Sequence, residues 1–248
     1  MVYLEGQWNG FKRLDFVLNG RQAILVCPHQ PVEGKKWLLK TEYFNAFPNF
    51  EIEMVRRGYH LAYIKNESGW HKPGDSDAKA ALADFLKEEF GLNEKCMPVG
   101  MSCGGLQAMY FTGKYPEKVA ALYLDAPVMN MLSCPCAVGR DVSQRQAAFD
   151  RMYQGMISAH GLMVDGMVNY RNHPIDQAHV LVENKIPVIL VSGDADYVVP
   201  YHENGKALKE YMLARGGNYT EVIKPGCDHH PHGLEDVTPL VEFAEKYY

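Results

Sequence analysis

The sequence lacks the marks of membrane proteins, secreted proteins and nucleic-acid-binding proteins. No run approaches the roughly 18 apolar residues of a membrane span, and the start of the chain has no basic segment followed by an apolar one. The 25 Lys and Arg residues are scattered among 30 Asp and Glu, and the net charge is -5, so no basic patch suits a polyanion. We therefore expect a cytoplasmic protein that binds neither membrane nor nucleic acid.

Cysteine is also sparse, with six residues in a chain of 248. They are spread mostly singly through apolar runs, which suits reduced, buried thiols better than a disulfide framework. The exception is Cys134-Pro135-Cys136, a pattern that redox centres and soft-metal sites can use. Because no second pair of Cys or His lies at ligand spacing nearby, packing of the two thiols in an apolar loop is favoured.

What the chain has is enough apolar material, 47% of its residues, for one α/β domain spanning residues 1–248. The first predicted strands, Phe11 to Leu18 and Ala23 to Val26, flank Asn19-Gly20 and read as an antiparallel hairpin. Strands and helices then alternate, which predicts a mostly parallel, twisted sheet with helices on both faces. The expected strands are His60 to Ile64, Cys96 to Val99, Val119 to Leu124, Ile186 to Val191 and Thr220 to Ile223, and the expected helices are Thr41 to Arg57, Asp77 to Phe90, Leu106 to Tyr115, Lys206 to Arg215 and Leu240 to Tyr247.

The alternation breaks at about residues 128–180, where the sequence is weakly periodic and rich in methionine. Methionine adapts to irregular apolar shapes, so this segment is predicted to be a helical cap or lid inserted over an active site. Ordinary packing between helices would explain the same methionines.

The most informative motif is Gly100-Met101-Ser102-Cys103-Gly104, a GxSxG pattern that follows an apolar run and precedes a helix-like segment. In a nucleophile elbow the chain leaves a strand, turns sharply at the serine and enters a helix at once. Only small residues fit beside such a turn. A glycine-rich turn with an incidental serine is the alternative, and the strand-turn-helix context favours the elbow.

Acidic residues and histidines follow later predicted strands, in the order that this elbow requires. Asp194 and Asp196 come after Ile186 to Val191, and the cluster from Asp228 to His232 comes after Thr220 to Ile223. Functional groups collect at the carboxyl ends of strands in such sheets. The chain order Ser, Asp, His is that of α/β-hydrolases. Asp125, at the end of an earlier strand, is a further candidate for the acid.

Three segments carry a resemblance to the α/β-hydrolases of the prolyl-oligopeptidase and carbohydrate-acylesterase type. They are Gly100 to Leu106, Ser192 to Pro200 and Lys224 to Asp236. Relatives with this layout are mostly bacterial serine hydrolases, many of them esterases that act on acylated sugars or on plant-wall phenolic esters. Two residues depart from the pattern, namely Cys103 after the serine and Asp228 before the histidine.

The resemblance implies a role for each candidate residue. Ser102 would be the nucleophile, His229 the base that takes its proton, and Asp196 the acid that holds the imidazole in the right tautomer. Asp196 matches the family position better than Asp194 does, and His229 matches it better than its neighbours. His230 and His232 remain alternatives as the base.

The oxyanion hole is expected to use two backbone N–H groups. One belongs to Cys103, which follows the nucleophile, and the other to the loop after Ala23 to Val26. The prolines in that loop have no N–H, which leaves His29 or Gln30, and Gln30 is favoured. Four aromatic residues are candidates for stacking on an acyl group or a sugar, with burial in the core as the alternative: Trp37, Tyr43, Phe44 and Trp70.

The sequence thus predicts a serine esterase that acts through an acyl-enzyme on small acylated carbohydrate or aromatic esters, with no cofactor and no metal. A metal site is disfavoured because the adjacent histidines His229 and His230 would point apart on an extended chain and no HExxH motif is present. Two rivals remain. One is a peptidase or amidase that uses the same residues, although the chain carries no sign of the propeller domain of larger relatives. The other is a non-catalytic binding module on the same fold.

Overall fold

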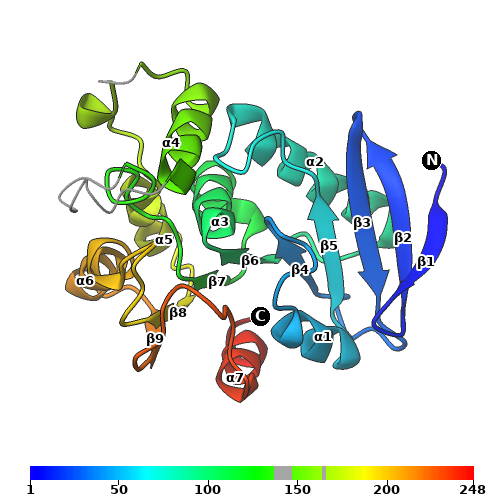
Figure 1. The fold of residues 1–248 in the computed structure, drawn as a ribbon. Coiled ribbons are helices and arrows are strands. Elements are labelled where there is room, and N and C mark those ends of the chain that lie inside the picture. Colours follow the sequence, from blue (N-terminus) through cyan, green and yellow to red (C-terminus); the bar gives the residue numbers. More distant parts are fainter. Residues whose placement is uncertain (137–146, 164–165) are drawn as a thin grey trace.

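The computed structural model describes residues 1–136, 147–163 and 166–248. These residues form a nine-stranded sheet with the strand order β1-β2-β3-β5-β4-β6-β7-β8-β9 (Figure 1). Its strands are β1 (Leu4–Trp8), β2 (Phe11–Leu18), β3 (Arg21–Cys27), β4 (Trp37–Lys40), β5 (His60–Ile64), β6 (Met97–Met101), β7 (Leu122–Asp125), β8 (Val188–Gly193) and β9 (Tyr219–Lys224). Pairing is antiparallel from β1 through β3 to β5 and parallel in the rest of the sheet.

Helices cover both faces of this sheet (Figure 1). One face carries α2 (Pro73–Phe90), α3 (Cys103–Lys114), α5 (Ala178–Glu183) and α6 (Gly205–Ala214), and the other carries α1 (Asn49–Arg56) and α7 (Thr238–Tyr247). Successive side chains of a strand point to opposite faces, so Leu39 of β4 packs in the first core and Leu38 in the second. The predicted mostly parallel sheet with helices on both faces is confirmed.

Local chemistry sets the bounds of these elements. Helix α2 begins where the Asp75 carboxylate accepts the backbone N–H of Lys72 at 2.8 Å, and it ends at Gly91, whose φ of 65° suits a left-handed cap. Strand β8 is buried along its whole length, as its run of Val, Ile and Leu predicts for a strand covered on both faces.

Two strands were not predicted, and one of them matters for function. Strand β4 has only four residues, all buried, so it has no alternation of apolar and polar positions. Its last residue, Lys40, is fully buried and forms an ion pair with Glu51 of α1. The helix predicted from Thr41 to Arg57 is shorter in the structure, where α1 begins at Asn49. Because β4 lies between β5 and β6, the loop that follows β4 lies beside Ser102.

The predicted insertion at about 128–180 combines helical pieces with turns and irregular segments in its described part; residues 137–146 and 164–165 lie outside the described part. Helix α4 (Ala147–Ala159) belongs to it, with short helical turns at Gly166–Asn169 and Pro174–Gln177. Its apolar side chains form a third cluster with the α3 region, which includes Trp70, Cys103, Leu106, Val128, Met131, Cys134, Met156 and Met167. In the described ranges, no helix is long and apolar enough to cross a bilayer.

Candidate active site

Ser102 occupies a strained turn between a strand and a helix. Strand β6 ends at Met101 and α3 begins at Cys103, and Ser102 between them has φ 54° and ψ -120°, a conformation that residues other than glycine rarely adopt. Backbone hydrogen bonds hold it there: its N–H donates to Asp125 O at 2.9 Å, and its carbonyl accepts from Gly105 and Val128 at 2.9 and 3.1 Å. The turn presents the half-buried side chain at the carboxyl edge of the sheet.

The glycines around Ser102 allow the strand and the helix to approach each other. A Cβ atom on Gly100 would lie 2.5 Å from Gly104 O and 2.7 Å from Gly105 Cα, closer than real Cβ contacts allow. Both obstacles are backbone atoms, which no rotamer change can remove. The small residues of the motif are therefore a steric requirement of this turn.

The substitution Gly100→Ala tests that requirement. We expect it to lower the free energy of unfolding by about 1–3 kcal/mol, because β6 and α3 must separate to admit one methyl group. For a chain of this size, thermal melting should then fall by several degrees. Gly6→Ala is the matched control, since a Cβ there meets nothing within 4 Å, and its melting temperature should not change measurably. Equal melting temperatures of the two variants would contradict the steric argument.

His229 joins Ser102 to a buried carboxylate. Its Nε2 lies 3.1 Å from Ser102 Oγ, and its Nδ1 lies 2.7 Å from Asp196 Oδ2. An ionised carboxylate only accepts hydrogen bonds, so Nδ1 carries the proton and Nε2 has a lone pair directed at the hydroxyl. The other oxygen of Asp196 accepts the N–H of Val199 at 2.7 Å, which fixes the carboxylate. The structure thus brings Ser102, His229 and Asp196 together in one chain of hydrogen bonds.

The other candidate acids and bases have different partners. Asp194 is exposed and accepts the backbone N–H of Gly226 at 2.6 Å, which joins the acid loop to the histidine loop. Asp125 is buried and pairs with Nδ1 of His232 at 2.5 Å. His230 is exposed, with its ring stacked on Phe47. None of these four side chains takes the place of Asp196 or His229 beside Ser102.

Asp228, one of the two departures from the family pattern, stabilises the same loops. One of its oxygens accepts the backbone N–H groups of Tyr197 and His229, at 2.9 and 2.7 Å. These two hydrogen bonds lower the pKa of the Asp228 carboxyl and keep it ionised at neutral pH. The carboxylate therefore ties the loop that carries Asp196 to the loop that carries His229.

The predicted use of Gln30 in the oxyanion hole is wrong. Strand β3 runs antiparallel to β5, with Val26 opposite Leu61 near the start of β5. The loop after β3 therefore lies at the amino ends of the parallel strands, whereas Ser102 lies at their carboxyl ends. The backbone there packs on Gly58, whose carbonyl accepts the Val32 N–H at 3.0 Å. His29, the alternative in the same loop, is excluded for the same reason.

The loop after β4 lies against the elbow instead. Thr41 donates its hydroxyl to Gly104 O at 2.6 Å, and a Cβ on Gly104 would lie 3.3 Å from Glu42 Cβ. Tyr43, the next residue, has φ 53°, and its side chain interacts with the Cys103 thiol. The sequence contained one signal for this loop, the apolar run Trp37-Leu38-Leu39, which sequence reasoning did not assign to a strand.

Cys103, the second departure, is buried. Its side chain belongs to the apolar cluster with Met131, Met156 and Trp70, and burial raises the pKa of its thiol to about 12. The thiol is therefore neutral at physiological pH. Cys134 is buried in the same cluster and Cys136 packs against it, which agrees with the packing interpretation of the two cysteines.

Of the four aromatic candidates for stacking on substrate, Tyr43 interacts with Cys103, next to the nucleophile. Trp70 belongs to the same apolar cluster as Cys103. Trp37 is fully buried in the first core and Phe44 packs in the second, so neither reaches the elbow.

The fold is that of the α/β-hydrolases, and the serine, imidazole and carboxylate at its site are arranged as nucleophilic catalysis by serine requires. The model of the prolyl oligopeptidase family matches residues 63–248, and the chain belongs to this family. The match includes the elbow, the acid loop and the histidine loop. Among proteins with curated descriptions, none matches the sequence significantly.

Solved structures with the same fold include enzymes of several sizes. Est1E from Butyrivibrio proteoclasticus matches with a TM-score of 0.61 and 17% identity, over 99% of this chain and 98% of that one. The acylaminoacyl peptidase of Pyrococcus horikoshii matches with a TM-score of 0.64 and 13% identity, over 92% of this chain and 37% of that one. A puromycin-hydrolyzing peptidase of Mycobacterium tuberculosis matches with a TM-score of 0.68 and 15% identity, over 95% and 38%. The chain spans little more than a third of these two peptidases.

Proposed function

We propose that the protein is a carboxylic-ester hydrolase that acts through an acyl-enzyme on Ser102. The observation that carries the proposal is the chain of hydrogen bonds from Asp196 through His229 to Ser102, at the tip of a strained elbow. A serine hydroxyl is a poor nucleophile at neutral pH because it holds its proton. The lone pair of His229 Nε2, directed at Ser102 Oγ, can accept that proton as the oxygen attacks. Asp196 would stabilise the imidazolium that forms when His229 takes the proton.

In the proposed reaction, Ser102 Oγ attacks the ester carbonyl while its proton moves to His229 Nε2. The oxyanion that forms would accept the N–H of Cys103, the first of helix α3, which has no acceptor within that helix. The second donor would be the N–H of Tyr43, whose distance of 3.4 Å from Glu42 Oε1 is too long for a strong hydrogen bond. His229 then returns the proton to the leaving alcohol, and the acyl group stays on Ser102. In the second half of the reaction, water gives a proton to His229 and attacks the acyl carbonyl. The bond to Ser102 Oγ breaks, His229 returns the proton to Oγ, and the acid leaves.

The acyl group is proposed to be apolar or aromatic. Cys103, next to the nucleophile, belongs to an apolar cluster that also includes Leu106, Met131 and Met156. Methionines adapt to flat and irregular groups, and Trp70 offers an aromatic face. The resemblance to carbohydrate acylesterases supports a sugar or a phenolic ester as the natural substrate.

A peptidase or amidase is the second candidate, because peptidases of similar fold occur among the solved structures. A side-by-side assay of p-nitrophenyl esters and aminoacyl p-nitroanilides distinguishes the two. We expect kcat/KM to be higher for the esters, and higher for an aromatic acyl group than for acetate. Faster turnover of an anilide would overturn the ester proposal and leave the serine mechanism intact.

A further inference from the structure

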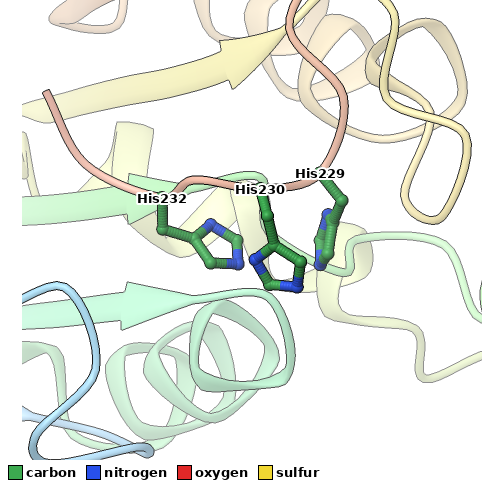
Figure 2. Close-up of side chains that lie close together, drawn as sticks. All are labelled: His229, His230 and His232. Carbon is green, nitrogen blue, oxygen red and sulfur yellow. The ribbon is translucent and has the colours of Figure 1, made fainter.

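Three histidines lie together on the loop between β9 and α7. The ring centroids of His229, His230 and His232 are 4.7 to 4.9 Å apart (Figure 2). Each ring offers a nitrogen, and these three nitrogens lie within 4.8 Å of one another. The expectation that His229 and His230 would point apart is wrong, because their rings lie on the same side of the loop, next to each other (Figure 2).

Two of the three rings are oriented by buried carboxylates. Asp196 accepts from Nδ1 of His229, and Asp125 accepts from Nδ1 of His232. Asp125 is itself fixed by the N–H of Gly233 at 2.8 Å and by the hydroxyl of Tyr123 at 3.0 Å. In zinc sites, a carboxylate often accepts the N–H of a ligating histidine in this way. The hydrogen bond keeps the proton on Nδ1 and leaves Nε2 unprotonated for the metal.

The third ring completes the set from the solvent side. His230 is exposed, so a hydrated ion can reach it, and its ring is stacked on Phe47 with the centroids 5.8 Å apart. A tetrahedral zinc ion with Zn–N bonds of about 2.0–2.1 Å needs ligand nitrogens about 3.3 Å apart. Because Asp125 and Asp196 orient His232 and His229, binding would draw the exposed ring of His230 toward the other two.

We propose that His229, His230 and His232 bind a Zn²⁺ ion, and that the bound ion reversibly inhibits the hydrolase. The inhibition rests on the proposed role of His229 as the base. Zinc and the Ser102 hydroxyl compete for one lone pair: a coordinate bond to His229 Nε2 forms as the hydrogen bond from Ser102 breaks. No electron or proton is exchanged. The charges of Asp125 and Asp196 offset that of the ion, and water fills its fourth position.

Binding is measured first, on protein that has been stripped with a chelator and carries Ser102→Ala. Titration with Zn²⁺ in a calorimeter should show one ion per chain, and Co²⁺ should give the visible absorption of a tetrahedral site. Adding His230→Gln should weaken Zn²⁺ binding at least tenfold, on the order expected for a damaged zinc site. His202→Gln, which alters an exposed histidine outside the cluster, should leave the affinity unchanged.

Inhibition is measured next, with the otherwise unaltered enzyme and a p-nitrophenyl ester. Zn²⁺ should abolish turnover, EDTA should restore it, and His230→Gln should raise the half-inhibitory concentration at least tenfold relative to His202→Gln. Absence of stoichiometric binding to the Ser102→Ala protein would overturn the metal site. Binding without inhibition would overturn the competition for His229. An enzyme that binds zinc but hydrolyses no ester would instead contradict the proposed function and leave the site standing.

Discussion

Ser102→Ala is expected to reduce ester hydrolysis by about 10⁴- to 10⁶-fold, the range measured when a serine nucleophile is removed. Alanine retains the backbone of the elbow but has no oxygen to attack the carbonyl, so no acyl-enzyme can form. The oxyanion donors remain and would sustain only a small residual rate. The measurement is kcat/KM with a p-nitrophenyl ester, together with labelling by a fluorophosphonate probe, which should disappear completely.

Ser158→Ala is the control for this experiment, because Ser158 is an exposed serine on helix α4. It should retain both turnover and labelling. The Ser102→Ala protein should melt within a few degrees of the unaltered protein, since alanine keeps the Cβ atom and the strained backbone of the elbow. Labelling that persists in Ser102→Ala would assign the nucleophile to another residue, and absence of labelling in folded, unaltered protein would favour a binding module.

Asp196→Asn is expected to reduce kcat by about 10⁴-fold with little change in KM. The amide is nearly the same size, but its NH₂ group cannot accept the Nδ1 proton of His229 as a carboxylate does. The imidazole would then place a proton on Nε2, where the lone pair is needed for Ser102. The imidazolium formed during acylation would also lose its neighbouring negative charge.

Asp194→Asn is the matched control, two residues away in the same loop. The Asp194 side chain accepts one backbone N–H, from Gly226, and an amide oxygen can still accept it. We expect a change in kcat of less than about threefold, since no protonation state in the site depends on it. Equal losses in the two variants would show that loop geometry, rather than the charge beside His229, controls the rate.

The three residues at the centre of the site could be predicted because each follows a strand. Ser102 follows β6, Asp196 follows β8 and His229 follows β9, and parallel strands place their carboxyl ends at one edge of the sheet. A local pattern of apolar residues is enough to locate a buried strand. The order of the strands then brings together residues that are more than ninety positions apart in the chain.

The proposed second oxyanion donor, Tyr43, could not be predicted because the strand before it, β4, was not recognised in the sequence. Buried strands show no alternation, and β4 is only four residues long with a buried lysine at its end. Without β4, the oxyanion donor was sought in the loop that follows β3. That choice was wrong because β3 is antiparallel to β5 and ends at the amino ends of the parallel strands, away from Ser102.

The sequence by itself determined seven of the nine strands and the elbow at Ser102, because these depend on local patterns. Chain order placed acidic residues and histidines after later strands, and the family resemblance singled out Asp196 and His229 among them. Only the tertiary structure decided which loop reaches the elbow, that Cys103 is buried in an apolar cluster, and that His229, His230 and His232 converge. These features depend on strand direction and on contacts between distant segments. Asp125 illustrates the difference: its partner His232 lies 107 residues further along the chain, and no local pattern encodes that pairing.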